Sequence, residues 1–241
     1  MNEPCRHDAP LGLERFESRA KIGRHVHAAA YAAIVLEGGY EEAGSAGRRR
    51  IAQGHVALHD IFDGHCNRFF RRGARVFNLP LSRPYARFKW ARIGDPDAIV
   101  RAAGKDRIEA EALLVAQLEP VAEPDGDWPD MLCNALRTTH CTSLTRWARE
   151  HGLARETLSH QFGAIFGATP ASFRAESRAR KALREIVSTA TPLAGIAARN
   201  GFADQPHMTR AIRALTGRTP SSWRTSLSFK TQDVGVSSFP A

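Results

Sequence analysis

Short apolar runs separated by glycine dominate the first third of the chain. Residues 31–36, 55–58 and 75–79 are short runs whose composition is compatible with strands. The intervening segments contain the breaks Gly38-Gly39, Gly44 to Gly47, Gly54, Gly64 and Gly73. Many short strands with regular turn residues are typical of a sandwich or small barrel. The pattern therefore predicts a β-barrel over residues 1–93.

A helical pattern replaces the strand pattern after this region. Residues 97–103 and 108–118 are rich in helix formers, and we expect them either to support a dimer or couple the two domains, or to cover the barrel. Residues 120–129 are rich in proline and aspartate, as linkers are. From there to about residue 227 almost all of the chain is predicted helical. The predicted organisation is a barrel (1–93), a helical connector (94–127), an all-α domain (128–227) and a disordered tail (228–241), which is an α+β two-domain fold.

The predicted all-α domain contains one pattern twice, with Gly167 and Gly217 marking equivalent positions 50 residues apart. Each copy begins with a short helix whose apolar residues follow i, i+3, i+4 spacing, and its second helix carries a longer apolar stripe. The first-helix residues are Leu144, Trp147 and Ala148 in one copy and Leu193, Ile196 and Ala197 in the other. The second-helix residues are Leu158, Phe162 and Ile165, and likewise Met208, Ile212 and Leu215.

A glycine separates the two helices of each copy. Gly152 and Gly201 suit the positive φ of a sharp turn, and an apolar residue, Leu153 or Phe202, follows each of them. Each second helix is followed by Gly-x-Thr-Pro, in which threonine caps the next helix and proline takes its first position. Helix, glycine turn and second helix together form the helix-turn-helix motif, whose second helix enters the major groove of DNA.

The charge of the chain supports a nucleic-acid partner for the helical part. The chain has 34 Lys and Arg and 25 Asp and Glu, a net charge of +9. Residues 1–136 hold 19 of each kind and are neutral, so the whole excess lies in residues 137–241. A neutral region joined to a basic one indicates that only the second meets a polyanion. A solvated basic face is the alternative that charge alone leaves open.

Residues 135–227 resemble the DNA-binding domain of the AraC/XylS family of bacterial regulators. The resemblance rests on the segment from Ile196-Ala197 through Gly201-Phe-Ala-Asp-Gln205 and Arg210 to Gly217-Arg-Thr-Pro-Ser-Ser-Trp-Arg224. The first copy matches through Leu158, Phe162, Gly167, Pro170 and Phe173, and the joining helix through Arg178 and Ala182. The sequence departs from the family at Met208 and Ile212, which keep the apolar stripe, and at Ala154, where a serine cap is usual. It also departs at Pro206, which we expect the start of the helix to tolerate because Asp204 is predicted to cap it.

The resemblance implies which side chains contact DNA. The exposed faces of the two second helices would contact bases, because arginine pairs with guanine, glutamine with adenine and glutamate with cytosine. These residues are Arg155, Glu156, Ser159 and His160 in the first copy and Gln205, His207, Thr209, Arg210 and Arg213 in the second. Arg174, Arg178 and Arg224 are expected to contact phosphates or to act as local helix charges.

Two histidines, His25 and His27, mark a candidate pocket in the predicted barrel. Residues two apart on a strand face the same side, here the interior. The spacing resembles the first cupin motif, although Tyr31 occupies its glutamate position and Ala57 its second-motif histidine position. His59 and His65 lie nearby as substitutes. A pocket for a small effector is preferred over a metal site, for which these four histidines are the candidate ligands.

The leading hypothesis is a DNA-binding, effector-responsive transcriptional regulator that is not an enzyme and has no required cofactor. Its expected partners are double-stranded DNA, a small effector and a second copy of the chain, with RNA polymerase as a further candidate. A metal-dependent cupin enzyme and a helical protein adaptor are the alternatives. Four cysteines without a C-x-x-C pair, a polar N-terminus and no long apolar segment predict a cytoplasmic protein without membrane spans.

Overall fold

The computed structural model describes residues 5–7, 11–82, 88–122, 126–138 and 143–225. The chain divides into two compact units, residues 2–173 and residues 174–241, so the division falls within helix α6 (Pro170–Ser188). Strands occupy the N-terminal part and helices the C-terminal part, which confirms the predicted α+β class. The predicted domain limits stay predictions, and the predicted tail (228–241) lies outside the described residues.

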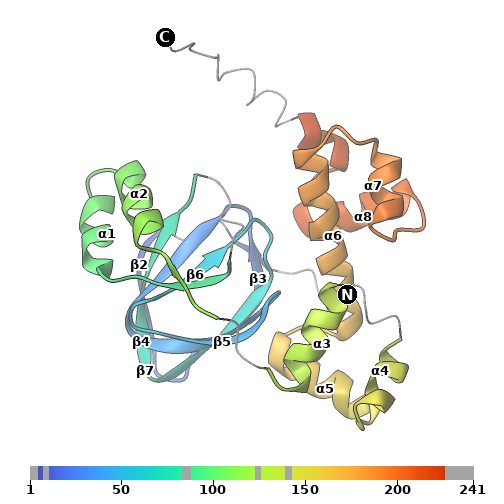
Figure 1. Ribbon diagram of the computed structural model, residues 1–241, viewed down its shortest axis with the longest axis horizontal. Helices are drawn as coiled ribbons and strands as arrows, with labels where there is room; N and C mark the ends of the chain where they lie inside the picture. The colour runs from blue at the N-terminus through green and yellow to red at the C-terminus, as the bar shows by residue number, and fades with distance from the viewer. Residues whose placement is uncertain (1–4, 8–10, 83–87, 123–125, 139–142, 226–241) are drawn as a thin grey trace. The chain divides into compact units, whose positions relative to one another are not determined.

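The strands form one sheet that is rolled around an interior (Figure 1). They are β1 (Cys5–His7), β2 (Gly12–Phe16), β3 (Lys21–His27), β4 (Tyr31–Gly44), β5 (Gly47–Ala52), β6 (His55–His59), β7 (His65–Pro80), β8 (Trp90–Arg92) and β9 (Glu119–Pro120). Their order is β1-β3-β7-β4-β6-β8-β9, with β2 paired to β7 and β5 to β4. All pairs are antiparallel except β1 with β3. The cupin resemblance of this sheet remains a prediction.

Two of the predicted breaks between strands, Gly38-Gly39 and Gly73, lie inside strands instead. Gly38 is within β4 and Gly73 is within β7, and both have positive φ. A Cβ atom on Gly38 would lie 2.1 Å from the carbonyl oxygen of Gly73. Glycine is therefore required here because two long strands approach closely beside a shift in their register, between Gly38 and Tyr40. A sequence pattern of short runs concealed two strands of 14 and 16 residues.

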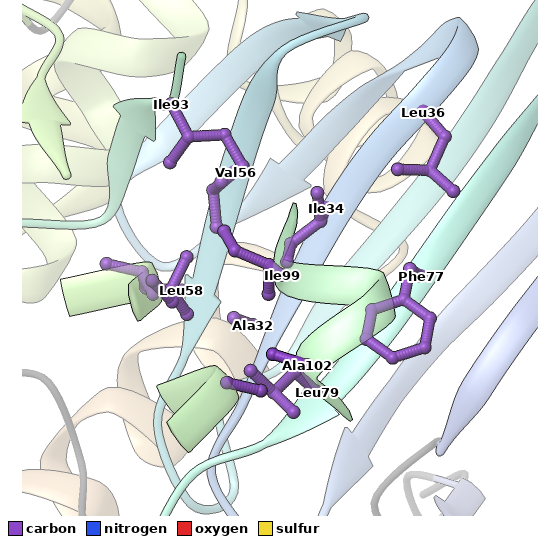
Figure 2. Packing of buried hydrophobic residues seen from close by; sticks show 12 residues of the cluster. Ala32, Ile34, Leu36, Val56, Leu58, Phe77, Leu79, Ile93, Ile99 and Ala102 are labelled. Atoms are coloured by element: carbon purple, nitrogen blue, oxygen red, sulfur yellow. The ribbon is translucent and has the colours of Figure 1, made fainter. Parts of the chain in front are cut away.

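Strand β4 is buried on both faces, which explains its continuous apolar run. Its even-numbered residues 32, 34 and 36 pack in one hydrophobic cluster, and residues 31, 33 and 35 pack in another that faces the interior of the sheet. Helix α1 (Pro96–Ala103) contributes Ile99 to the first cluster (Figure 2). Helix α2 (Arg107–Gln117) contributes Leu114 to the same cluster. These helices therefore cover the outer face of the sheet, the last of the roles predicted for them.

The remaining helices follow the predicted repeat closely. They are α3 (Trp128–Arg137), α4 (Leu144–Glu150), α5 (Arg155–Phe166), α6, α7 (Leu193–Arg199) and α8 (Gln205–Thr216), and residues 220–225 are also helical. Pro170 begins α6, and the Thr169 hydroxyl accepts a hydrogen bond from the amide of Ser172 at 3.1 Å, so the predicted Thr-Pro start is confirmed. No helix in the described ranges is long and apolar enough to cross a membrane.

Candidate functional site

Helices α4 and α5 form the first helix-turn-helix unit. Trp147 and Ala148 of α4 and Leu158 and Phe162 of α5 are buried, as the apolar pattern predicted. Gly152 takes φ +65° in the turn between them. The sequence pattern missed Phe166, which is fully buried and stacks on Phe162 with ring centroids 4.5 Å apart. The helix ends where Gly167 adopts the left-handed conformation.

Helices α7 and α8 form the second unit in the same way. Ile196, Met208 and Ile212 are fully buried, and Phe202 fills the turn behind Gly201, which has φ +69°. The Asp204 carboxylate accepts a hydrogen bond of 2.6 Å from the amide of His207 and so caps α8. This cap agrees with the prediction that the chain tolerates Pro206 beside it.

The predicted base-contacting residues lie on the exposed sides of α5 and α8. Ser159, His207 and Thr209 are partly exposed, and the other six, Arg155, Glu156, His160, Gln205, Arg210 and Arg213, are exposed. Each set lies on its helix opposite the buried stripe that holds the helix in place. The structure thus leaves these side chains accessible to a partner, and their roles as base contacts stay predictions.

Two of the arginines that were predicted to contact phosphates instead form hydrogen bonds within and beside the second helix-turn-helix unit. Arg178 donates a hydrogen bond of 3.0 Å to the carbonyl of Gly201 and lies over the Phe202 ring. Arg224 donates one of 2.7 Å to the carbonyl of Thr191. These contacts favour the local structural role that was left open for them. Arg174 is partly buried on α6.

The two second helices differ at their first residue in a way that predicts a stability change. Ala154 begins α5 without a side-chain cap, whereas Asp204 caps α8. We expect Ala154→Ser to stabilise the protein by about 0.5–1 kcal/mol. The serine hydroxyl would accept a hydrogen bond from a backbone amide of the first turn that has no partner within the helix. Urea denaturation measures the change. Ala154→Val is the control, because valine at this position supplies no hydrogen-bond acceptor, and an equal gain from both variants would contradict the cap.

A cavity of about 420 Å³ lies inside the rolled sheet. Strands β2, β3, β4, β6 and β7 line it with a mixture of aromatic, histidine and amide side chains, including Phe16, Tyr40, Phe69, Asn67 and Asn78. The four predicted histidines, His25, His27, His59 and His65, all line it and are buried. The structure therefore brings together the candidate effector or metal residues from three strands.

The hydrogen bonds of His25 and His65 define which ring nitrogen faces the cavity. His25 Nδ1 lies 2.9 Å from the carbonyl of Gly23, and His65 Nδ1 lies 2.9 Å from the carbonyl of Asp63. Because a carbonyl only accepts, both Nδ1 atoms donate, which places the lone pair of each ring on Nε2 when that ring is neutral. The two residues are also cross-strand partners of β3 and β7.

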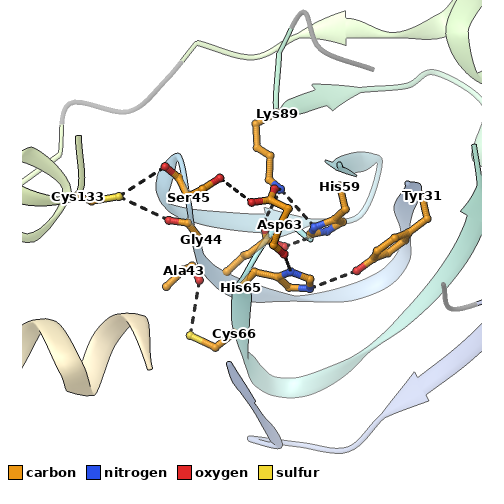
Figure 3. Close-up of polar contacts among 11 residues, drawn as sticks. Tyr31, Ala43, Gly44, Ser45, His59, Asp63, His65, Cys66, Lys89 and Cys133 are labelled. Atoms are coloured by element: carbon orange, nitrogen blue, oxygen red, sulfur yellow. Dashed lines mark hydrogen bonds and ion pairs between the residues drawn. The ribbon is translucent and has the colours of Figure 1, made fainter. Parts of the chain in front are cut away.

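A buried network of charged and polar groups, which the sequence pattern did not predict, surrounds these histidines (Figure 3). Glu42 is fully buried, with Oε2 3.3 Å from His59 Nε2 and Oε1 3.9 Å from Lys89 Nζ. Lys89 also forms an ion pair with Asp63 and lies 3.2 Å from His59 Nδ1. The alternation from Tyr40, which is buried on the same strand, could have indicated that Glu42 points inward.

Burial keeps the rings in this network neutral. Desolvation lowers the pKa of His59 well below its usual value, and the Lys89 charge lowers it further. Desolvation, followed by His59, lowers the pKa of His65 in the same direction. Burial raises the pKa of Tyr31 well above its usual value, so its hydroxyl is protonated and donates to His65 Nε2 at 3.2 Å. Neutral imidazoles are the form that binds metal ions.

The sheet holds the C-terminal end of α5 through the last three carbonyls of that helix. Arg24 on β3 donates a hydrogen bond of 3.1 Å to the carbonyl of Phe166. On β7, Cys66 donates one of 3.3 Å to the carbonyl of Ile165, and Arg68 bonds that of Ala164. These carbonyls have no partner within the helix, and the arginines also balance its dipole. The sequence pattern gave no indication of these contacts, which join segments about 100 residues or more apart.

Two helix-turn-helix units with exposed second helices define the class of this chain as a helix-turn-helix protein. The model of a helix-turn-helix domain family matches residues 147–226. The virulence regulon transcriptional activator VirF of Yersinia enterocolitica is 31% identical over 81 residues, covering 34% of this chain and 30% of that protein. The arabinose operon regulatory protein of Escherichia coli is 32% identical over 84 residues, covering 35% and 29% respectively.

The matched segment spans under a third of the length of these curated relatives. Among solved structures, fatty-acid-bound ToxT from Vibrio cholerae is similar over 90% of this chain and 95% of its own, with 11% identity and a TM-score of 0.43. The matched helix-turn-helix domain covers residues 147–226, which lie within the part of the chain that resembles the AraC/XylS family, so the comparisons support the resemblance for that part.

Proposed function

We propose that the protein is a sequence-specific DNA-binding transcriptional regulator that places α5 and α8 in successive major grooves. The observation that carries this proposal is the pair of helix-turn-helix units, each with a buried stripe on one side of its second helix and exposed arginines on the other. The net charge of +9, all of which lies in residues 137–241, supports a polyanionic partner. The curated relatives named above are transcriptional regulators of this type.

The cavity in the sheet supports a role for a small effector. A volume of about 420 Å³ lies in the usual range for small-molecule sites, and its walls combine aromatic rings with a few polar groups. An effector would change DNA binding only if it prefers one of two states of the protein. We further propose that the regulator acts in the cytoplasm, that it forms a homodimer and that RNA polymerase is a further candidate partner.

The enzyme alternative has no support from the comparisons, because the similar proteins that they identify are regulators. The buried histidine network would have been the site of such an enzyme. It is more simply explained as part of the sensory cavity of the proposed regulator.

Selection of bound duplexes from a random DNA pool, with the full chain as bait, tests the proposed function. We expect an asymmetric site with two blocks separated by about 10 base pairs, one helical turn of DNA. Arg210→Ala should remove the preference at one block and weaken binding by about 1–3 kcal/mol, the value of a bidentate base contact. Arg101→Ala, an exposed arginine on α1, is the matched control and should change neither.

Binding that ignores sequence and disappears at modest salt would contradict the proposal. That result would show that the basic charge alone attracts DNA, because nonspecific phosphate contacts carry the steep salt dependence. A selected site that Arg210→Ala and Arg101→Ala affect equally would exclude α8 as a recognition helix.

A further inference from the structure

The histidine cluster has the geometry of a metal site that the helix-turn-helix function does not use. The ligand atoms of His25, His27 and His65 all lie within 4.8 Å of one another, and the three side chains are buried. An ion held by imidazole nitrogens at about 2.0–2.1 Å keeps neighbouring ligands roughly 3–3.5 Å apart. Small inward shifts of the rings are therefore enough to enclose an ion.

The orientation of the rings also fits metal ligation. In metal sites a ligating histidine donates its second ring N–H to a carbonyl or carboxylate, which fixes the tautomer and aims the other nitrogen at the ion. His25 and His65 make this contact with the carbonyls of Gly23 and Asp63. In both rings the lone pair is on Nε2 as a result. Tyr31 donates to one of these nitrogens and would have to give it up to an ion.

A nearby carboxylate makes a cation favourable at this place. The two oxygens of Glu42 are buried and accept no well-aligned hydrogen bond from the described residues. Their nearest partners are His59 Nε2 at 3.3 Å and Lys89 Nζ at 3.9 Å, and Lys89 is already paired with Asp63. A buried carboxylate without hydrogen bonds is costly unless a positive charge lies close. The ligand atoms of Glu42, His59 and His65 also lie within 4.8 Å of one another, so an ion on His65 lies beside this carboxylate.

We propose that His25, His27 and His65, with Glu42 as the balancing charge, bind a divalent transition-metal ion inside the sheet, and that its occupancy controls how β3 and β7 hold recognition helix α5. Imidazole with a carboxylate suits zinc, iron, cobalt or nickel rather than calcium or magnesium. The proposed control of α5 by the ion, the regulatory half of the proposal, rests on the proposed DNA-binding function. The proposed metal site does not depend on that function.

The path from the cluster to α5 consists of neighbouring residues on two strands. His25 and His65 face the cavity, whereas the adjacent residues Arg24 and Cys66 contact the carbonyls of Phe166 and Ile165 at the end of α5. Arg24 also lies over the Phe173 ring at 5.2 Å. An ion shared by His25 and His65 joins β3 to β7 and so fixes the positions from which these two donors act.

A second path leads from the cluster to α3. The backbone carbonyl of Asp63 accepts from His65, and its carboxylate accepts a hydrogen bond of 2.7 Å from Ser45. Cys133 on α3 in turn contacts the carbonyls of Gly44 at 3.6 Å and Ser45 at 3.7 Å (Figure 3). Burial raises the pKa of this thiol to about 12, so it stays protonated and donates. Helix α3 packs in the same cluster as Phe162 of α5.

Metal binding is tested on the full chain after treatment with a chelator. Titration with Co²⁺, followed by its visible absorption, and competition by Zn²⁺ should show one ion per chain. His27→Gln and His65→Gln should each weaken binding by at least about 100-fold, because each removes one ligand. His55→Gln is the matched control and should retain wild-type affinity. His55 lies on β6 outside the cavity, and its Nδ1 forms a hydrogen bond with the carbonyl of Ala52.

Circular dichroism of each variant separates ligand loss from unfolding, and His27→Gln decides the test if His65→Gln does not fold. The absence of stoichiometric Co²⁺ binding by the wild-type chain would overturn the metal site. Equal affinity of His27→Gln and His55→Gln would overturn it as well, because the ion would then lie elsewhere.

The regulatory half is tested with the selected duplex. Its Kd, measured by fluorescence anisotropy with and without Zn²⁺, should differ at least about fivefold in the wild-type chain, the lower end of usual coupling. Arg24→Met should keep Co²⁺ binding but lose this difference, whereas Arg15→Met on β2 should keep both. An unchanged Kd in a zinc-loaded wild-type chain would overturn the coupling. If no specific duplex is selected, the proposed function fails, while the Co²⁺ titration still decides the metal site.

Discussion

Gly38→Ala is expected to destabilise the sheet by about 3–5 kcal/mol. The new Cβ atom would lie 2.1 Å from the carbonyl oxygen of Gly73 and 3.1 Å from the Cα atom of Ala74, both of them backbone atoms. A backbone atom cannot turn aside as a flexible side chain does, so β4 and β7 must separate, at a cost typical of overpacking. The φ of +66° adds about 1–2 kcal/mol for any residue with a Cβ. Urea denaturation followed by circular dichroism measures the loss.

Gly152→Ala is the matched control for this prediction. Gly152 has nearly the same φ, +65°, but a Cβ atom there would have no neighbour within 4 Å. This variant should therefore lose only the conformational part, about 1–2 kcal/mol. If the two variants lost equal stability, the close approach of β4 and β7 would be contradicted and backbone conformation alone would explain the requirement for glycine.

The glycine pair illustrates where sequence patterns failed. Local sequence does not distinguish a glycine within a strand from a glycine in a turn. The difference depends on the register with a partner strand that is distant in the sequence. Gly54 was correctly placed in a turn between β5 and β6, whereas Gly38 and Gly73 were placed in breaks that do not exist. Local composition therefore located β4, β6 and part of β7 but underestimated the lengths of β4 and β7.

The helical repeat was predictable because its determinants are local. Buried stripes, the turn at Gly152 or Gly201 and the Thr-Pro starts recur within stretches of about 20 residues, and each is present in the structure. The pattern overlooked one buried residue, Phe166. It lies one position after Ile165, which was assigned to the apolar stripe and is only partly buried. The error follows from the helical period of 3.6, under which residues i+7 and i+8 lie on nearly the same face.

The cavity was only half predictable. His25 and His27 could be placed together from strand alternation, and the structure adds His59 and His65 beside them. Glu42 was not found because two register shifts in β4 separate it from Tyr31, so alternation cannot be carried from one residue to the other. The contacts of Arg24 and Cys66 with α5 depend on the packing of segments that are distant in sequence, and no local pattern records them.

Phe162→Ala is expected to lower the free energy of unfolding by about 3–5 kcal/mol, the usual cost of removing a buried phenyl ring. Phe162 is fully buried, stacks on Phe166 and meets the Phe173 ring edge-to-face at 5.4 Å. Its cluster also includes Leu132 of α3 and Cys66 of β7, so the cavity would be left where helices and sheet pack together. Urea denaturation followed by circular dichroism measures the change.

Met131→Ala provides the control, because Met131 on α3 is 50% exposed and its truncation leaves no enclosed cavity. Its loss should stay within about 1 kcal/mol. The DNA selection adds a second readout for Phe162→Ala, because α5 depends on this ring for its position. Below the unfolding temperature of the variant, the block assigned to α5 should lose preference while the block assigned to α8 keeps it. Equal loss at both blocks would show that the two recognition helices do not depend on separate cores.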